Sequence, residues 1–172
     1  MGRASVKENK TIYQTSRENL GLTREKAAEL LGWIPAERIE RIENEKSEPH
    51  PDEVLRMAEI YKNPALCNYY CARECPIGQK YVPEIPVKDL SQIVLEMLAS
   101  LNAMRKEQER LIEITADGKI AGDEIRDFIH IQNELEKISI AVETLQIWVE
   151  KTLSEGRIDA EEYNRIKNES IE

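Results

Sequence analysis

The region from Thr11 to Lys62 constrains the fold most, because residues that stop one helix and start the next recur in it at short intervals. Leu20-Gly21-Leu22-Thr23 ends a helix on a glycine, which readily adopts the left-handed cap conformation, and starts another on a threonine, whose hydroxyl can accept from the first free amides. That second helix is predicted from about Arg24 to Leu31, and Gly32 closes it. Pro35 suits the first position of a third helix, predicted to reach about Asn44. The region therefore predicts short helices joined by tight turns.

The apolar residues of this region support the same division, since most recur three or four residues apart, which is the helical period. They are Ile12, Leu20, Leu22, Ala28, Leu31, Ile39, Ile42, Val54, Leu55, Ala58 and Ile60. His50-Pro51 opens a fourth helix and Asn63-Pro64 a fifth, each with a proline in the first turn. The spacing therefore predicts five short helices in residues 1–75.

Two strings in this region resemble the Cro/repressor-type (XRE family) helix-turn-helix DNA-binding proteins. The first is Leu22-Thr23-Arg24-Glu25-Lys26-Ala27-Ala28-Glu29-Leu30-Leu31-Gly32, and the second is Ile39-Glu40-Arg41-Ile42-Glu43-Asn44-Glu45-Lys46, followed by Pro49. The resemblance covers roughly the first 40% of the chain. It departs from the family in a turn one residue longer than usual before Ile39, and in Arg24, where the family often has glutamine. It implies a five-helix, phage-repressor-like domain whose third helix reads double-stranded DNA.

The resemblance also implies which residues meet DNA, because such proteins place base contacts near the start of the third helix. An arginine can grip guanine with two hydrogen bonds, and a glutamate can accept from the cytosine amino group. The candidate DNA-binding residues are Arg24, Glu37, Arg38, Arg41 and Lys46. A wider basic face for phosphates would comprise Arg3, Lys7, Lys10, Arg17, Arg24, Arg38, Arg41 and Lys46.

Carboxylates on the third helix oppose DNA binding, because they repel phosphates. Glu37, Glu40, Glu43 and Glu45 accompany its two arginines, so we expect DNA affinity to be weak or strongly salt-dependent. An alternative interpretation is a helix whose charged face is only solvated, since Glu37 and Arg41 form an i,i+4 pair worth about 0.2–0.5 kcal/mol without DNA. In that case the region is a protein-interaction module with a degenerate helix-turn-helix.

The net charge of −9 is unevenly distributed along the chain. Residues 1–81 hold 13 basic and 13 acidic residues, whereas residues 82–172 hold 11 and 20. Charged residues make up 33% of the chain and aromatic ones only 5%, which favours a soluble, helical, cytoplasmic protein. The polar N-terminus does not resemble a secretory signal.

No glycine-rich phosphate loop is present, and neither His50 nor His130 has a nucleophile nearby in sequence, so we expect no enzyme.

Three cysteines, Cys67, Cys71 and Cys75, follow one another at four-residue spacing on the fifth helix. They could ligate a metal or cluster, with His50 as a fourth ligand, or act as a redox sensor. Helical i,i+4 spacing spreads sulfurs along a line about 6 Å apart, unlike the usual ligand spacings. We therefore favour a stripe of small apolar side chains that packs on the domain, and no cofactor.

From Pro76 to Pro86, three prolines and a glycine predict a linker without regular helix. Residues 87–172 then form an acidic helical hairpin, with helices at about 87–115, 122–153 and 159–170. Two heptad stripes predict a coiled-coil seam: Leu90, Val94, Met97, Leu101, Met104 and Leu111, then Phe128, Ile131, Leu135, Ile138, Val142, Leu145 and Val149.

Apolar residues off this seam, namely Ile140, Ile147 and Trp148, leave a second face for another chain to cover. This predicts a homodimer through residues 87–153.

The turns at Asp117-Gly118 and Glu155-Gly156 resemble the second half of a calcium-binding EF-hand loop, but we interpret them as glycine-capped turns. The sequence as a whole predicts an all-α, dimeric transcriptional regulator.

Overall fold

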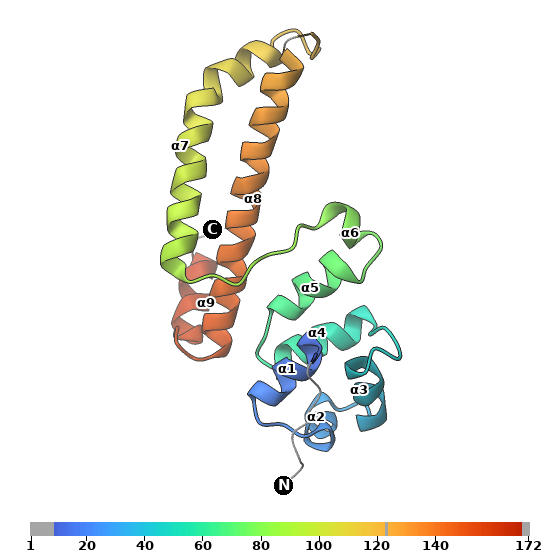
Figure 1. Ribbon diagram of the computed structural model, residues 1–172. Helices are drawn as coiled ribbons and strands as arrows, with labels where there is room; N and C mark the ends of the chain where they lie inside the picture. Colours follow the sequence, from blue (N-terminus) through green and yellow to red (C-terminus); the bar gives the residue numbers. More distant parts are fainter. Residues whose placement is uncertain (1–8, 123, 170–172) are drawn as a thin grey trace. The chain divides into compact units, whose positions relative to one another are not determined.

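The computed structural model describes residues 9–122 and 124–169, and all the regular elements in those ranges are helices (Figure 1). They are α1 (Ile12–Asn19), α2 (Arg24–Leu31), α3 (Ala36–Glu43), α4 (Pro51–Ile60), α5 (Ala65–Arg73), α6 (Gly78–Tyr81), α7 (Leu90–Thr115), α8 (Glu124–Ser154) and α9 (Ala160–Glu169). This confirms the predicted all-α class, with short helices first and long ones after. The described residues fall into two compact units, one ending at Glu84 and resuming at Glu150, the other spanning Ile85–Val149.

The first five helices share one apolar core. Its buried residues are Tyr13, Ala27, Leu31, Ile34, Ile39, Ile42, Val54, Met57, Ala58, Tyr61 and Leu66. Burying a side chain of this size contributes roughly 1.5–3 kcal/mol, so the core fixes how α1 to α5 pack. Most of the apolar residues that define the predicted helical period contribute to it.

Helix boundaries follow the predicted capping residues closely. α2 occupies the predicted range, and α4 begins at Pro51 as expected. α3 begins at Ala36, so Pro35 is its N-cap and not its first residue. α5 ends at Arg73, which places Cys75 beyond the helix. The expected cysteine stripe therefore has only two members within the helix.

The expectation of a linker without helix is wrong for one turn, because α6 forms at Gly78–Tyr81. Gly78 permits this turn, since a Cβ atom there would lie only 1.9 Å from the backbone oxygen of Cys71. The close approach of α6 to α5 thus requires glycine at this position. Prolines 83 and 86 then keep the chain extended as far as α7.

The second unit contains α7 and the greater part of α8, which run antiparallel and pack together (Figure 1). Asp89 caps α7 by accepting from the backbone N–H of Gln92 at 3.0 Å. Near the other end of the hairpin, Arg110 Nε donates to Asp127 Oδ2 at 2.7 Å and joins the two helices. In the described part of the chain, none of the helices has the length and apolar character needed to cross a membrane.

The predicted coiled-coil seam coincides only in part with the contact between α7 and α8, where its member Ile131 is fully buried. The buried residues of these helices within the unit are Ile93, Ser100, Ile114, Ile131, Glu134, Ala141 and Thr144. Leu90, Val94, Leu101, Leu135 and Val142, which belong to the predicted seam, are 38–47% exposed. The apolar surface of each helix is therefore wider than its single neighbour covers.

Candidate nucleic-acid interface

A tight turn fixes the relation between α2 and α3. The Thr23 hydroxyl caps α2 by accepting from the Lys26 backbone N–H at 3.3 Å. Gly32 ends the helix with φ +84°, a conformation that favours glycine, and its N–H donates to the Ala28 oxygen at 3.0 Å. Ile34 in the turn is buried in the core. These contacts hold α3 at a defined angle to α2, as a helix-turn-helix requires.

α3 turns one face to the core and the other to solvent. Ile39 and Ile42 are at most 2% exposed, and Glu43 is equally buried. Glu37, Glu40 and Arg41 are exposed on the opposite side. Because residues three and four apart share a helical face, these three side chains form the outward surface of the helix.

The outward surface of α3 carries both signs of charge. Arg41 lies beside the two exposed glutamates, one residue after Glu40 and four after Glu37, and Lys46 is exposed in the segment that follows the helix. Within the described ranges, neither Arg41 nor Lys46 forms an ion pair. Trp33, in the turn just before α3, is 55% exposed. The surface therefore offers two cations and one aromatic ring to a ligand, beside the exposed carboxylates of Glu37, Glu40 and Glu45.

Arg38, by contrast, is committed to contacts within the domain. Its Nε and Nη2 donate to the two carboxylate oxygens of Glu53 at 2.7 and 2.6 Å. Its Nη1 donates to Ser47 Oγ at 2.7 Å, and Nη2 also donates to the backbone oxygen of Glu48 at 2.8 Å. This arginine ties α3 to the start of α4 and to the segment between them.

Glu53 is well adapted to hold Arg38. Burial opposes ionisation of its carboxyl group, but the hydrogen bonds from Arg38 and from the His50 backbone N–H outweigh burial and lower its pKa below the ordinary value. The carboxylate is therefore ionised at neutral pH. It also accepts from His50 N at 2.7 Å, which completes the N-terminal cap of α4.

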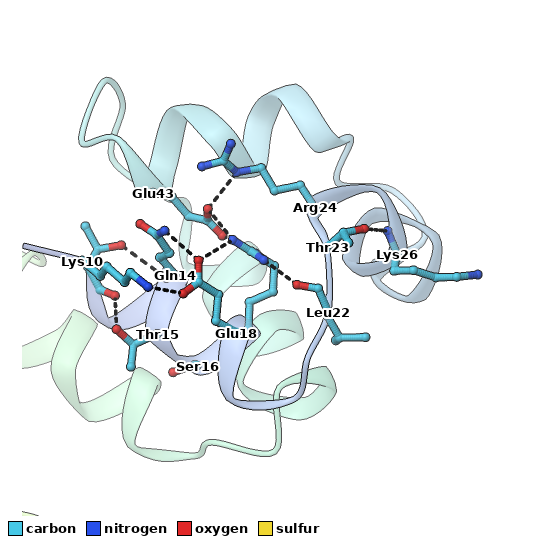
Figure 2. Close-up of polar contacts among 12 residues, drawn as sticks. Lys10, Gln14, Thr15, Ser16, Glu18, Leu22, Thr23, Arg24, Lys26 and Glu43 are labelled. Atoms are coloured by element: carbon cyan, nitrogen blue, oxygen red, sulfur yellow. Dashed lines mark hydrogen bonds and ion pairs between the residues drawn. The ribbon is translucent and has the colours of Figure 1, made fainter. Parts of the chain in front are cut away.

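A buried cluster of charges lies on the side of α3 opposite its outward surface, between α1, α2 and α3. Glu43 is 1% exposed, and its carboxylate accepts from Arg17 Nε at 2.5 Å and Arg17 Nη2 at 2.9 Å. Arg24 Nε donates to the same carboxylate at 2.8 Å. Figure 2 shows Arg24 and Glu43 reaching toward each other from their two helices. Arg17 Nη1 also donates to the Leu22 oxygen, at 2.5 Å.

This cluster was not identified from the sequence, where Arg17 was placed on the basic face. Arg17 is only 5% exposed, so that assignment is wrong for this residue. The positions of the two residues could have indicated the pair, because each lies on the buried face of its helix. Arg17 lies four residues after buried Tyr13, and Glu43 lies four residues after buried Ile39. Opposite charges in the buried phase of two helices indicate a structural pair.

The other predicted cations are placed as follows. Arg24 is partly exposed, with 27% of its side chain accessible beside its bond to Glu43. Lys10 pairs with Glu18 at 2.7 Å. Arg3 and Lys7 lie outside the described residues. Of the predicted DNA-binding residues, Glu37, Arg41 and Lys46 share the solvent side, Arg24 lies at its edge, and Arg38 points into the domain.

The three cysteines carry free thiols and are half-buried. Burial, and then the neighbouring Cys71, raise the pKa of the Cys67 thiol above its ordinary value, so it is a poor nucleophile at neutral pH. Over residues 9–122 and 124–169, no group of three or more His, Cys, Asp or Glu side chains is arranged to hold a metal ion. Of the three, Cys67 packs against the core of the first five helices.

Comparison with known proteins bears on the first unit alone. Residues 15–65, from α1 to the start of α5, match a family model described as helix-turn-helix. No curated protein and no solved structure matches the chain. The match contains α2, the turn at Gly32, and α3, whose geometry agrees with it. Residues 15–65 therefore match the XRE-type helix-turn-helix family that the sequence resemblance implied.

Proposed function

We propose that this protein is a sequence-specific DNA-binding transcriptional regulator that acts as a dimer and carries no enzymatic activity. The observation that carries the proposal is the outward surface of α3, which presents Arg41 to solvent within a helix-turn-helix domain. In such domains the second helix of the motif enters the major groove. Here that helix is α3.

The side chains that are exposed on and beside α3 are the ones that we propose contact DNA. Glu37 and Arg41 lie on the solvent side of α3 and are the proposed readers of base edges, Arg41 toward guanine and Glu37 toward a cytosine amino group. Lys46 and Arg24 flank this surface and are proposed to meet phosphates, together with the N-terminus of α2. Arg38 holds α3 in place through Glu53 and acts on DNA only indirectly.

Two copies would be joined through residues 87–153. A dimer of this kind presents two recognition helices about one DNA turn apart, roughly 34 Å. The preferred site is then two half-sites in inverted orientation. The exposed apolar residues of α7 and α8, among them Leu98 and Leu101, support pairing in this region.

Selection of bound sequences from a random DNA pool tests the proposal. The full chain is expected to enrich an inverted repeat with half-site centres about 10 base pairs, or a multiple of one turn, apart. The Arg41→Ala variant is expected to lose preference at one position of each half-site. Recovery of unenriched sequences by the unchanged protein would contradict sequence-specific binding.

A second candidate function is a protein-interaction module whose helix-turn-helix does not touch DNA. Glu37 and Glu40 favour it, because both carboxylates face solvent on α3, where they would repel phosphates. The exposed ring of Trp33 would suit a protein partner. Failure to bind any duplex at low salt would favour this candidate over the regulator.

A further inference from the structure

Each helix of the hairpin has a second apolar stripe that lies one residue after the buried one. On α7, buried Ile93 and Ser100 are followed by exposed Val94 and Leu101. On α8, buried Glu134 and Ala141 are followed by exposed Leu135 and Val142, which are 46% and 41% exposed. The second stripe thus has the same seven-residue spacing as the first and the same offset from it on both helices.

The two stripes lie on the same side of the hairpin. A helix turns about 100° per residue, so each stripe is rotated by roughly a quarter turn from the contact between α7 and α8. Both helices are right-handed and they run antiparallel (Figure 1). Viewed along the hairpin, the rotation is clockwise on one helix and counter-clockwise on the other, which brings both stripes to one face. This face, defined by Leu90, Val94, Leu98, Leu101, Leu135 and Val142, is called here the open face.

The phase of the heptads indicates what the open face packs against. In an isolated two-helix coiled coil, the apolar heptad points directly at the neighbouring helix. Here the heptad of α7 is centred away from the contact with α8, and its members Val94 and Leu101 lie on the open face. An offset of this kind is expected in a four-helix bundle, in which each helix packs on two neighbours. One hairpin supplies two of the four helices.

Side chains that border the open face on α8 are also suited to burial. Gln132, Ser139 and Gln146 follow one another at seven-residue spacing beside Leu135 and Val142. All three are uncharged, in a chain of which 33% is charged. Uncharged borders are typical of a contact surface, since charged residues are depleted from the centres of interfaces.

We infer that the open face binds the open face of a second copy of this chain, so that two hairpins form a four-helix bundle. A second copy fits because it carries the same heptad phase and the same uncharged border, which makes the surface self-complementary about a two-fold axis. The inference rests on the proposed dimeric regulator and specifies its interface. The back of the hairpin, which includes the exposed Leu95 and Ile129, takes no part.

Sedimentation equilibrium of the full chain, without DNA, tests the interface. The unchanged protein is expected at twice the mass of one chain, 39.8 kDa from 19.9 kDa. Leu101→Glu and Val142→Glu each bring a carboxylate into the interface from both copies, and they are expected to raise the dimer dissociation constant at least about 100-fold. Both residues are exposed in a single hairpin, so helical content by circular dichroism should be unchanged.

Ile129→Glu and Leu95→Glu are the matched controls, because they add the same charge to exposed apolar positions on the back of the hairpin. They are expected to leave the dimer intact. A monomeric unchanged protein, or a dimer that the back-face variants dissociate and the open-face variants do not, would overturn the inference. DNA binding by the monomeric variants is measured separately: residual salt-dependent affinity leaves the regulator standing, whatever the fate of the interface.

Discussion

Replacing Glu43 with alanine is expected to lower the free energy of unfolding of the helix-turn-helix domain by about 3–5 kcal/mol. The side chain of Arg17 is 6% accessible, and both of its bonds to Glu43 would be lost. The buried guanidinium would keep the Leu22 oxygen and a longer ion pair, 3.7 Å, with the carboxylate of Glu18. An unpaired buried charge costs far more than a surface pair, and natural domains have only about 5–15 kcal/mol of stability in total.

Urea unfolding followed by Trp33 fluorescence measures this effect, with Trp148 changed to phenylalanine in every variant. Glu40→Ala is the control, since it removes a carboxylate from the exposed side of the same helix and is expected to change stability by less than about 0.5 kcal/mol. The double change Arg17→Met with Glu43→Leu removes both charges together and is expected to recover most of the loss. Equal stability of the Glu43 and Glu40 variants would refute the role given to the cluster.

Replacing Arg41 with alanine is expected to weaken binding to the selected DNA site by about 10- to 100-fold, because a two-bond contact to guanine is worth about 1–3 kcal/mol. Stability should not change, since Arg41 is exposed. Fluorescence anisotropy of a labelled duplex measures the affinity. Unchanged affinity, with the protein folded, would show that the outward side of α3 does not meet the bases.

Glu40→Ala provides a test of opposite sign on the same helix. Its carboxylate is exposed next to Arg41, on the side of α3 proposed to face DNA. A carboxylate and a DNA phosphate that lie 4 Å apart in water repel each other by about 1 kcal/mol. Removing the Glu40 carboxylate is expected to strengthen DNA binding a few-fold on any sequence. Weaker binding by this variant would mean that Glu40 itself makes a favourable contact.

The short helices were largely predictable because their boundaries are encoded locally. Thr23 and Gly32 act on their own neighbours in the chain, so α2 could be placed to the residue. Pro35 was misplaced by one position, since proline also fits the N-cap. The helix-turn-helix family of residues 15–65 was likewise evident from the string around these caps.

What the sequence could not supply was the partner of each charge. Arg38 and Arg41 lie three residues apart and look equivalent in the sequence, yet Glu53, fifteen residues from Arg38, engages only the first. The choice depends on how α4 packs beside α3, which is a tertiary property. The same holds for Arg17 and Glu43, separated by 26 residues.

The hairpin presents the converse case. The heptads correctly predicted two long antiparallel helices, but part of the predicted seam is exposed and not packed between them. Heptad phase reports the direction of the whole apolar interior, including parts supplied by another chain. Leu135 and Val142 are the members of the predicted seam on α8 that are exposed in the single hairpin.

The salt dependence of binding to random duplex DNA tests the central claim most directly, because release of counterions from phosphates is independent of sequence. If Lys46, Arg24 and the start of α2 meet about three phosphates, affinity should fall about 40-fold between 50 and 200 mM salt. The logarithm of affinity would then decline steeply and linearly with the logarithm of salt concentration. A slope near zero, or no binding at about 50 mM salt, would contradict the account.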